Sequence, residues 1–218
     1  MSSGWIELFN GKDLNNWKPM KNDNCEWEVA GGVPLKADDP KLFEIQPGEG
    51  MMVNGPTGRT SDILTDFEHG DCELHIEFVV SLKSNSGVYF MGNYEVQILD
   101  SWGETGLKYG TCGGIYCRWI DEKPVDGTPP RVNASRRPGD WQEYDIIFRA
   151  PKFDADGNKT RNACFEKVVW NGEVIHENVE LLGPTRGAMT SEDVPRGPLR
   201  LQGDHGPVAY RNVRLKEL

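Results

Sequence analysis

Two segments in which apolar and polar residues alternate place the strongest constraint on the fold. The apolar set of residues 71–81 is Cys72, Leu74, Ile76, Phe78 and Val80, and that of residues 94–99 is Tyr94, Val96 and Ile98. Successive side chains of a β-strand point to opposite faces of a sheet, so each segment is predicted to be a strand with one apolar face. No amphipathic helical pattern extends beyond about two turns. The sequence therefore predicts an all-β protein.

Further strands are predicted from the same alternation and from turn residues. They cover residues 5–9, 85–91, 141–149, 164–170, 173–176, 199–202 and 208–215, and a hairpin is predicted to join 27–29 to 33–35 through Gly31-Gly32. Gly92-Asn93 and Asn171-Gly172 are dipeptides of the kind found in tight hairpin turns. The strands nearest the two ends of the chain, 5–9 and 208–215, can pair and hold the termini in place.

The 218 residues are predicted to form a single domain, 1–218, because no linker or internal repeat divides them. The 25 glycines and 14 prolines fit many short strands joined by turns. Several of them fall in residues 101–139, an expected long irregular insert of the kind that often carries function. The formal net charge of −10 argues against a nucleic-acid partner. No apolar run approaches the roughly 20 residues that span a bilayer, so no membrane span is expected.

The first residues, Met1-Ser2-Ser3-Gly4, lack the charged and apolar regions of a signal peptide. This pattern favours a cytoplasmic protein, or a periplasmic or secreted one if a leader has been removed. The five cysteines are an odd number, so at least one is expected to stay unpaired. Cys72 and Cys164 are predicted to pack in the core as small hydrophobic residues. Cys112 and Cys117 lack the C-x-x-C spacing of a zinc or redox site.

Glu95 and Gln97 share the polar face of the predicted strand 94–99 and are expected to lie about 7 Å apart along it. Glu95 is a candidate for an acid–base or ligand role, and the alternative is a solvated carboxylate on an exposed sheet face. The Gln97 amide suits hydrogen bonds to hydroxyl groups. Asp100 ends the same strand, and its position in the alternation points its side chain to the face opposite Glu95 and Gln97. It is either a catalytic group or the cap of the following turn.

His205 is one of four histidines and lies in a glycine-flanked turn. It is a candidate for a base, a metal ligand or a group that polarises a carbonyl. Arg200 and Gln202 are two residues apart and share one face of the preceding predicted strand. Arg211 is either a group that stabilises an anion or, like Arg200, one member of a surface ion pair.

The aromatic candidates for stacking on a sugar ring are Trp102, Tyr116, Trp119 and Trp141. The first three fall in the irregular insert, where binding residues concentrate. Trp141 begins a predicted strand and is expected to pack in the core.

Two patterns bear on metal binding. His75 and Glu77 are two residues apart on one strand face, so they either reach one ion or form an ordinary solvated face. Residues 154–158 begin like a calcium loop, but Gly157 is the fourth residue of the run rather than the sixth, and no glutamate stands at the twelfth. A hairpin turn is therefore expected there.

An ordered set of motifs along nearly the whole chain resembles the family of 3-keto-disaccharide hydrolases, also described as 3-keto-glucoside 1,2-lyases and hydratases. The motifs are Trp5 to Leu14 with Trp17; Trp27 with Gly32; Phe67 to Phe78; Asn85 to Val88; Tyr94 to Asp100; Gly114 to Tyr116; Pro138 to Trp141; Asn171-Gly172; Gly197 to Gln202 with His205; and Arg211 to Val213. Residues 102–112 match no motif of the family. The resemblance implies a concanavalin A-like jelly roll, which is a β-sandwich of two antiparallel sheets.

The resemblance also implies a small carbohydrate substrate that is already a ketone at C3 of a pyranose. A base removes the C2 proton, the C1 substituent leaves by β-elimination, and water adds back. On this basis the candidate catalytic residues are Glu95, His205 and Asp100. The candidate substrate-binding residues are Asn85, Gln97, Trp102, Tyr116, Gln202 and Arg211, and the site is expected on the concave sheet face under residues 101–139.

Two other functions fit the same residues. One is a carbohydrate-binding module without catalysis, since jelly rolls also serve as lectins. The other is an ordinary glycoside hydrolase, which needs a second carboxylate about 5 to 9.5 Å from Glu95. The oxygen and imidazole groups permit a divalent metal ion without requiring one. The sequence leaves the oligomeric state open.

Overall fold

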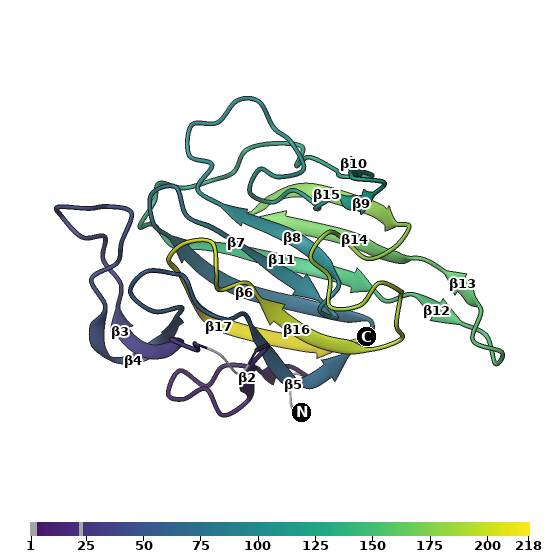
Figure 1. Ribbon diagram of the computed structural model, residues 1–218, viewed down its shortest axis with the longest axis horizontal. Coiled ribbons are helices and arrows are strands. Elements are labelled where there is room, and N and C mark those ends of the chain that lie inside the picture. The colour runs from purple at the N-terminus through teal and green to yellow at the C-terminus, as the bar shows by residue number, and fades with distance from the viewer. Residues whose placement is uncertain (1–3, 22–23) are drawn as a thin grey trace.

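A computed structural model of the chain describes residues 4–21 and 24–218. Within those ranges the protein has no helix, and most of its strands form two antiparallel sheets that pack face to face as an all-β jelly-roll sandwich (Figure 1). Two further pairs of short strands form separate hairpins. The described residues therefore contain no helix that could cross a membrane. Met1, Ser2 and Ser3, on which the expectation about a signal peptide depends, lie outside the described residues.

The smaller sheet has five strands in the order β2-β5-β16-β7-β8. Their bounds are Trp17–Pro19 for β2, Ile63–His69 for β5, Gly197–Leu201 for β16, Asn85–Phe90 for β7 and Tyr94–Leu99 for β8. The β7–β8 ladder has no register shift, and Tyr89 faces Glu95 directly across it. This sheet carries the candidate site on its outer face.

The larger sheet follows the order β15-β14-β11-β6-β17-β4-β3, with β1 added to β17. The bounds are Ile6–Glu7 (β1), Glu28–Gly32 (β3), Gln46–Val53 (β4), Cys72–Val80 (β6), Gln142–Arg149 (β11), Ala163–Trp170 (β14), Glu173–Leu181 (β15) and Val208–Glu217 (β17). The pairing of β1 with β17 joins the two ends of the chain, as expected, although β1 covers only two residues.

The core fills the space between the two sheets. The alternating residues that were predicted to face inward on β6 and β8 are all buried there, together with Phe90, Tyr144, Phe148, Trp170 and Tyr210. Their packing leaves the other face of β8 to Glu95 and Gln97. Cys72 is part of this core, whereas Cys164 is only partly buried, so the prediction for Cys164 was wrong. All five cysteines are unpaired.

The segment 101–139 is ordered against the edge of the smaller sheet. Ile115 forms bridges with Val96 of β8 and with Thr128, and Cys112, Ile115 and Cys117 are buried. The segment also contains a small hairpin of β9 (Arg118–Ile120) and β10 (Lys123–Val125). It therefore extends the β8 edge, which would otherwise expose unpaired backbone groups.

Several predicted elements differ from the structure. Residues 27–35 do not form a hairpin, because β3 continues through Gly31 and Gly32 and pairs with β4 instead. A Cβ on Gly31 would lie 2.7 Å from the Pro47 carbonyl oxygen, so these glycines permit close strand contact rather than a turn. The sequence patterns did not reveal β2, β4 or β5. The turn at 154–158 does join a hairpin, between β12 (Lys152–Phe153) and β13 (Lys159–Arg161).

Candidate functional site

A cavity of about 290 Å³ lies on the outer face of the smaller sheet; we refer to it as the Glu95 cavity. Strands β7 and β8 contribute Asn85, Tyr89, Glu95 and Gln97, the segment after β16 contributes Gln202 and His205, and two loops contribute Tyr116, Arg186 and Gly187. These residues meet because alternate side chains of neighbouring strands stand on one face.

Glu95 is the one acid among the described residues that line the cavity, and only 3% of its surface is exposed. Burial disfavours the charged carboxylate and raises its pKa from 4.5 to about 8. A hydrogen bond with the Tyr89 hydroxyl and the positive charge of Arg200 act in the opposite direction, while the charge of Asp62 adds to the rise. A carboxyl group with a pKa near neutrality is suited to proton transfer.

Gly87 makes the room that Glu95 occupies. It lies on β7 beside Tyr89 and opposite Gln97. A Cβ at this position would lie 2.3 Å from Glu95 Oε1 and 3.0 Å from Glu95 Cδ. The absence of a side chain at Gly87 therefore allows the carboxyl group to lie flat against the sheet.

Gln97 lines the same cavity, and one of its side-chain atoms is an unpartnered acceptor. Its Nε2 donates to the Gly110 carbonyl oxygen at 3.3 Å, which fixes the orientation of the amide because only the nitrogen can donate. The Oε1 atom is buried and has no hydrogen-bond partner among the described residues. Leaving a buried acceptor unpaired costs free energy, and a ligand hydroxyl group would recover it once a shift of the side chain exposes Oε1.

Arg200 is buried and connects the cavity to a second acid. Its guanidinium carbon lies 3.7 Å from the centroid of the Tyr89 ring, and its Nε is 3.1 Å from Asp62 Oδ2. Asp62 is held in turn by the backbone N–H of Gly203, which donates to Oδ1 at 2.9 Å. Burial raises the pKa of Asp62, while Gly203 and Arg200 lower it. These contacts fix the position of Tyr89, the partner of Glu95.

Tyr116 and Arg186 form the side of the cavity that the loops contribute. The backbone N–H of Tyr116 donates to the carbonyl oxygen of Glu95 at 3.0 Å, which attaches this loop to β8. The Arg186 guanidinium stacks on Trp119, 4.0 Å from the ring centroid, and hydrogen-bonds with the Tyr116 side chain. Trp119 therefore positions Arg186 rather than lining the cavity itself.

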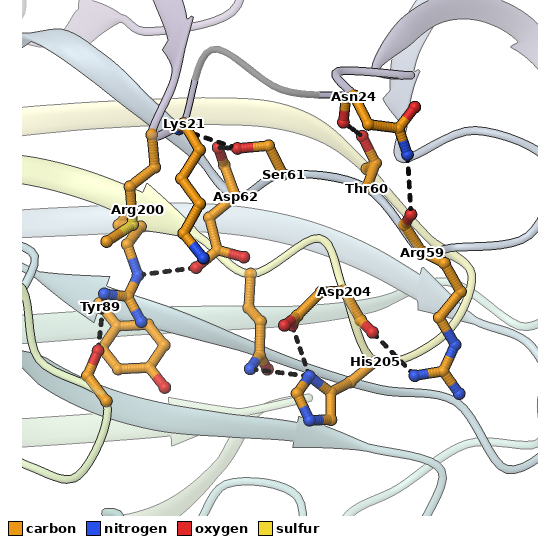
Figure 2. A pocket seen from close by; sticks show the side chains of 13 residues that line it. Lys21, Asn24, Arg59, Thr60, Ser61, Asp62, Tyr89, Arg200, Asp204 and His205 are labelled. Atoms are coloured by element: carbon orange, nitrogen blue, oxygen red, sulfur yellow. Dashed lines mark hydrogen bonds and ion pairs between the residues drawn. The ribbon is translucent and has the colours of Figure 1, made fainter.

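A second cavity of about 460 Å³ adjoins the first and shares Tyr89, Gly187, Gln202 and His205 with it (Figure 2). We refer to it as the Asp62 cavity. His205 stands where the two meet, with about half of its side chain exposed. Its Nδ1 lies beside the Asp204 carboxylate and 3.2 Å from Gln202 Nε2.

The structure brings together six of the nine residues predicted for the site: Asn85, Glu95, Gln97, Tyr116, Gln202 and His205. Asp100 is outside both cavities and caps the turn that follows it, because its Oδ1 accepts the backbone N–H of Trp102 at 3.3 Å. Its Oδ2 accepts the backbone N–H of Lys83, in the turn before β7, at 2.8 Å. Trp102 is 53% exposed and also lies outside them.

Arg211 belongs to the larger sheet and is separated from the candidate site by the core. Its neighbour Tyr210 points into the core, so Arg211 points to the outer face. There its Nε is 2.6 Å from Glu77 Oε2 and its guanidinium stacks on Trp141 at 4.0 Å. The ion-pair interpretation of Arg211 is therefore the one that its surroundings support.

No group of three or more His, Cys, Asp or Glu side chains in the described ranges is arranged to hold a metal ion. His75 Nδ1 is 2.7 Å from Asp145 Oδ1, and its Nε2 is 3.9 Å from Glu77, so this cluster is a set of ion pairs on the outer face of the larger sheet. Asp154 accepts backbone N–H groups of its own turn. The divalent ion stays a prediction without an identified ligand set.

Sequence patterns missed three residues that shape the site. Tyr89 could have been found, because it continues the two-residue period of Asn85 and Gly87 on one strand face. Asp62 and Arg186 lie in irregular segments that carry no periodic signal.

Comparisons with known proteins agree with this architecture. The 3-keto-alpha-glucoside-1,2-lyase-like domain model matches residues 4–216. A solved structure from Parabacteroides distasonis, described as a "putative glycosyl hydrolase", is 32% identical, with 99% of this chain and 84% of that chain covered and a TM-score of 0.70. A second structure from that organism with the same description is 18% identical, with 99% and 94% covered and a TM-score of 0.62. It supports the fold alone.

No curated protein matches the chain. The domain match extends over nearly the entire chain, and the 32% identical structure covers it equally well. Both agree with the resemblance that the sequence motifs indicated. They place the chain in a family of carbohydrate-active, hydrolase- or lyase-like enzymes. The chain belongs to the 3-keto-alpha-glucoside-1,2-lyase-like family.

Proposed function

We propose that the protein cleaves 3-keto-glycosides at the Glu95 cavity by elimination and hydration. The observation that carries this proposal is a buried carboxyl group with a pKa of about 8, next to an unpartnered buried amide oxygen in one cavity. The family to which the chain belongs supports the choice of a keto sugar.

Glu95 is assigned the role of base. The C3 ketone acidifies the C2–H bond, the carboxylate takes that proton, and the electron pair forms an enolate on the C3 oxygen. When the enolate collapses, the C1–O bond breaks and the leaving oxygen takes up a proton. Water then adds across C1 and C2, which yields the free 3-keto sugar and the released alcohol. A base whose pKa is near the working pH is strong enough to take the proton and is still partly in its unprotonated form.

The negative charge of the enolate needs stabilisation by nearby donors. Arg186 and Tyr116 are assigned this role, because both line the Glu95 cavity and hydrogen-bond with each other. His205 is assigned to the leaving oxygen, since it stands where the two cavities meet. Gln97 Oε1 is assigned to a sugar hydroxyl.

The test compares a 3-keto-disaccharide with its unoxidised parent. We expect release of the second sugar from the keto compound only. In deuterium oxide the 3-keto sugar product should carry deuterium at C2, because the base exchanges its proton with solvent before rehydration. Cleavage of the parent, or cleavage of the keto compound without C2 deuterium, would contradict the elimination route. A sample without protein controls for spontaneous exchange.

The Glu95→Gln variant tests the assigned base. It keeps the size of the side chain and should lower turnover about 10²-fold or more. Its thermal unfolding should remain cooperative, which separates loss of the base from loss of the fold. Unchanged turnover would remove Glu95 from the mechanism.

A second candidate is an ordinary glycoside hydrolase that uses Glu95 and Asp62. The observation in its favour is that the charge of Asp62 acts on the pKa of Glu95. Asp62 is, however, paired with Arg200 and lines the Asp62 cavity rather than the Glu95 cavity. The same assay decides, because this mechanism would cleave the unoxidised parent.

A further inference from the structure

The Asp62 cavity adjoins the Glu95 cavity, and His205, which we assign to the leaving oxygen, lines both. It is the larger of the two cavities, with about 460 Å³ against about 290 Å³. Since Gln202 and His205 line both, one ligand can extend from the first cavity into the second without leaving the protein surface. The Asp62 cavity plays no part in the proton transfer assigned to Glu95.

The charge of the Asp62 cavity differs in sign from that of the whole protein. Three cationic side chains line it, from Lys21, Arg59 and Arg200, against two carboxylates, from Asp62 and Asp204. The chain as a whole has a formal net charge of −10. An excess of positive charge in a cavity of an acidic protein favours a ligand of negative charge.

Each of the two carboxylates already lies beside a basic side chain. Asp62 is 3.1 Å from Arg200 Nε, and the Asp204 carboxylate lies beside His205 Nδ1. Within residues 4–21 and 24–218, by contrast, no carboxylate lies within salt-bridge distance of Lys21 or Arg59. Among the described residues, the positive charge that is available to a ligand therefore comes from Lys21 and Arg59.

Arg59 is held in place for such a ligand. Its Nη1 donates to the backbone carbonyl oxygen of Asp204 at 2.8 Å, and its own carbonyl oxygen accepts the Asn24 side chain at 3.3 Å. Figure 2 shows Lys21 and Arg59 reaching the cavity from different segments. A fixed guanidinium loses less side-chain entropy on binding than a free one and pairs well with planar or tetrahedral anions.

We propose that the Asp62 cavity is the subsite for the leaving group, and that it prefers a leaving group that carries an anionic substituent, a carboxylate or a phosphate, recognised by Arg59 and Lys21. This inference rests on the proposed function for the position of the scissile bond. The anion preference itself is a property of the cavity and can be measured without turnover.

The first experiment measures binding of free sugars to the intact protein by ligand-observed NMR at low ionic strength. D-Glucuronate and D-glucose 6-phosphate are compared with D-glucose, and the two anions separate a carboxylate preference from a phosphate preference. At least one anion should bind about tenfold more tightly than glucose, and added salt should reduce the difference. Equal affinity for all three sugars would overturn the proposal.

The variants Arg59→Gln and Lys21→Met identify the residues responsible. Each should weaken binding of the preferred anion about threefold to tenfold and leave glucose binding unchanged. Arg161→Gln and Lys41→Met are matched controls, because both residues are exposed and lie outside the two cavities. An equal loss in the controls would show a general charge effect and contradict the assignment.

A kinetic comparison separates this inference from the proposed function. A methyl 3-keto-glucoside tests cleavage alone, and a 3-keto-glucoside with a glucuronate leaving group tests the subsite. Cleavage of both with equal KM would refute the subsite and retain the function. Anion binding that depends on Arg59, without cleavage of either compound, would support an anion site and refute the function.

Discussion

Replacement of Gly87 by alanine should displace the Glu95 carboxyl group while leaving the fold intact. The new Cβ would lie 2.3 Å from Glu95 Oε1, whereas carbon and oxygen normally stay about 3.4 Å apart or more. The carboxyl group must therefore move by about 1 Å. A displacement of this size between reacting groups costs about 10²-fold in rate, so turnover of a 3-keto-disaccharide should fall by about that factor.

The same substitution should lower stability only modestly. Gly87 lies in β7 without the left-handed backbone that only glycine tolerates, so alanine can gain about 0.4–1 kcal/mol from the unfolded state. Crowding against Glu95 costs about 1–3 kcal/mol, since the end of a flexible side chain can move. The balance is a net destabilisation of about 0–2.6 kcal/mol, so the Tm should fall by no more than about 10 °C for a domain of this size.

The assay is the initial rate of keto-disaccharide cleavage, with Tm measured on the same samples. Gly106→Ala is the matched control, because a Cβ there meets nothing within 4 Å. The double variant Gly87→Ala/Glu95→Asp adds a test that does not depend on absolute rates. The shorter aspartate removes the contact, so Gly87→Ala should cost less in that background. A single Gly87→Ala variant with the activity of wild type would refute the assigned position of Glu95.

Three further predictions concern the same cavity. The rate constant kcat/KM should rise with pH through about 8 as Glu95 ionises. Tyr89→Phe should move this inflection to higher pH, because the hydrogen bond from Tyr89 lowers the pKa of Glu95. An unmoved pH–rate profile would contradict this role of Tyr89. The folded-state pKa of Glu95 lies above its ordinary 4.5, so the folded protein loses stability as pH rises from 4.5 to about 8. Urea denaturation should therefore show that Glu95→Gln raises the free energy of unfolding by a few kcal/mol at pH 9 and not at pH 4. Gln97→Leu removes the unpartnered buried acceptor together with the long hydrogen bond to Gly110, so the Tm should change little while KM rises about tenfold. An unchanged or lower KM would show that Oε1 does not bind substrate.

The sequence predicted those parts of the site that lie on regular strands. The two-residue period placed Glu95 and Gln97 on the face opposite Tyr94 and Val96, and the structure has the same division. The period is reliable here because the inner face of β8 must contact the core, which fixes the direction of every other side chain. His205 was identified by residue type and its turn, not by any pattern that places it beside Glu95.

Arg211 shows why the alternation of side chains along a strand was not enough to predict the site residues. Tyr210 is buried and Arg211 points to the other face of the same strand, but the alternation of side chains does not say which sheet a strand joins. Strand β17 pairs with β6 and β4 in the larger sheet, and its register shifts between Arg211 and Arg214. The pairing of strands that are far apart in sequence depends on the whole topology, and local patterns do not contain it.

The glycine pair at 31–32 illustrates a different limit. Adjacent glycines usually indicate a turn, because they adopt conformations that other residues avoid. In this chain they stay in β3, where a Cβ on Gly32 would lie 2.4 Å from Gln46 Oε1 of β4. The same residue type serves a turn in one context and close strand contact in another, and only the partner strand distinguishes them.

The raised pKa of Glu95 is a consequence of long-range packing rather than of its own strand. An outer face of a five-stranded sheet would normally leave a carboxylate in water with an ordinary pKa. Here the 101–139 segment pairs with the edge of β8 through Ile115, and the loop that carries Arg186 closes a further side. Both segments follow Glu95 in the chain and reach it only in the folded state. If Glu95 is the base, its reactivity depends on these covering segments, so changes that loosen them should lower its pKa and its catalytic power together.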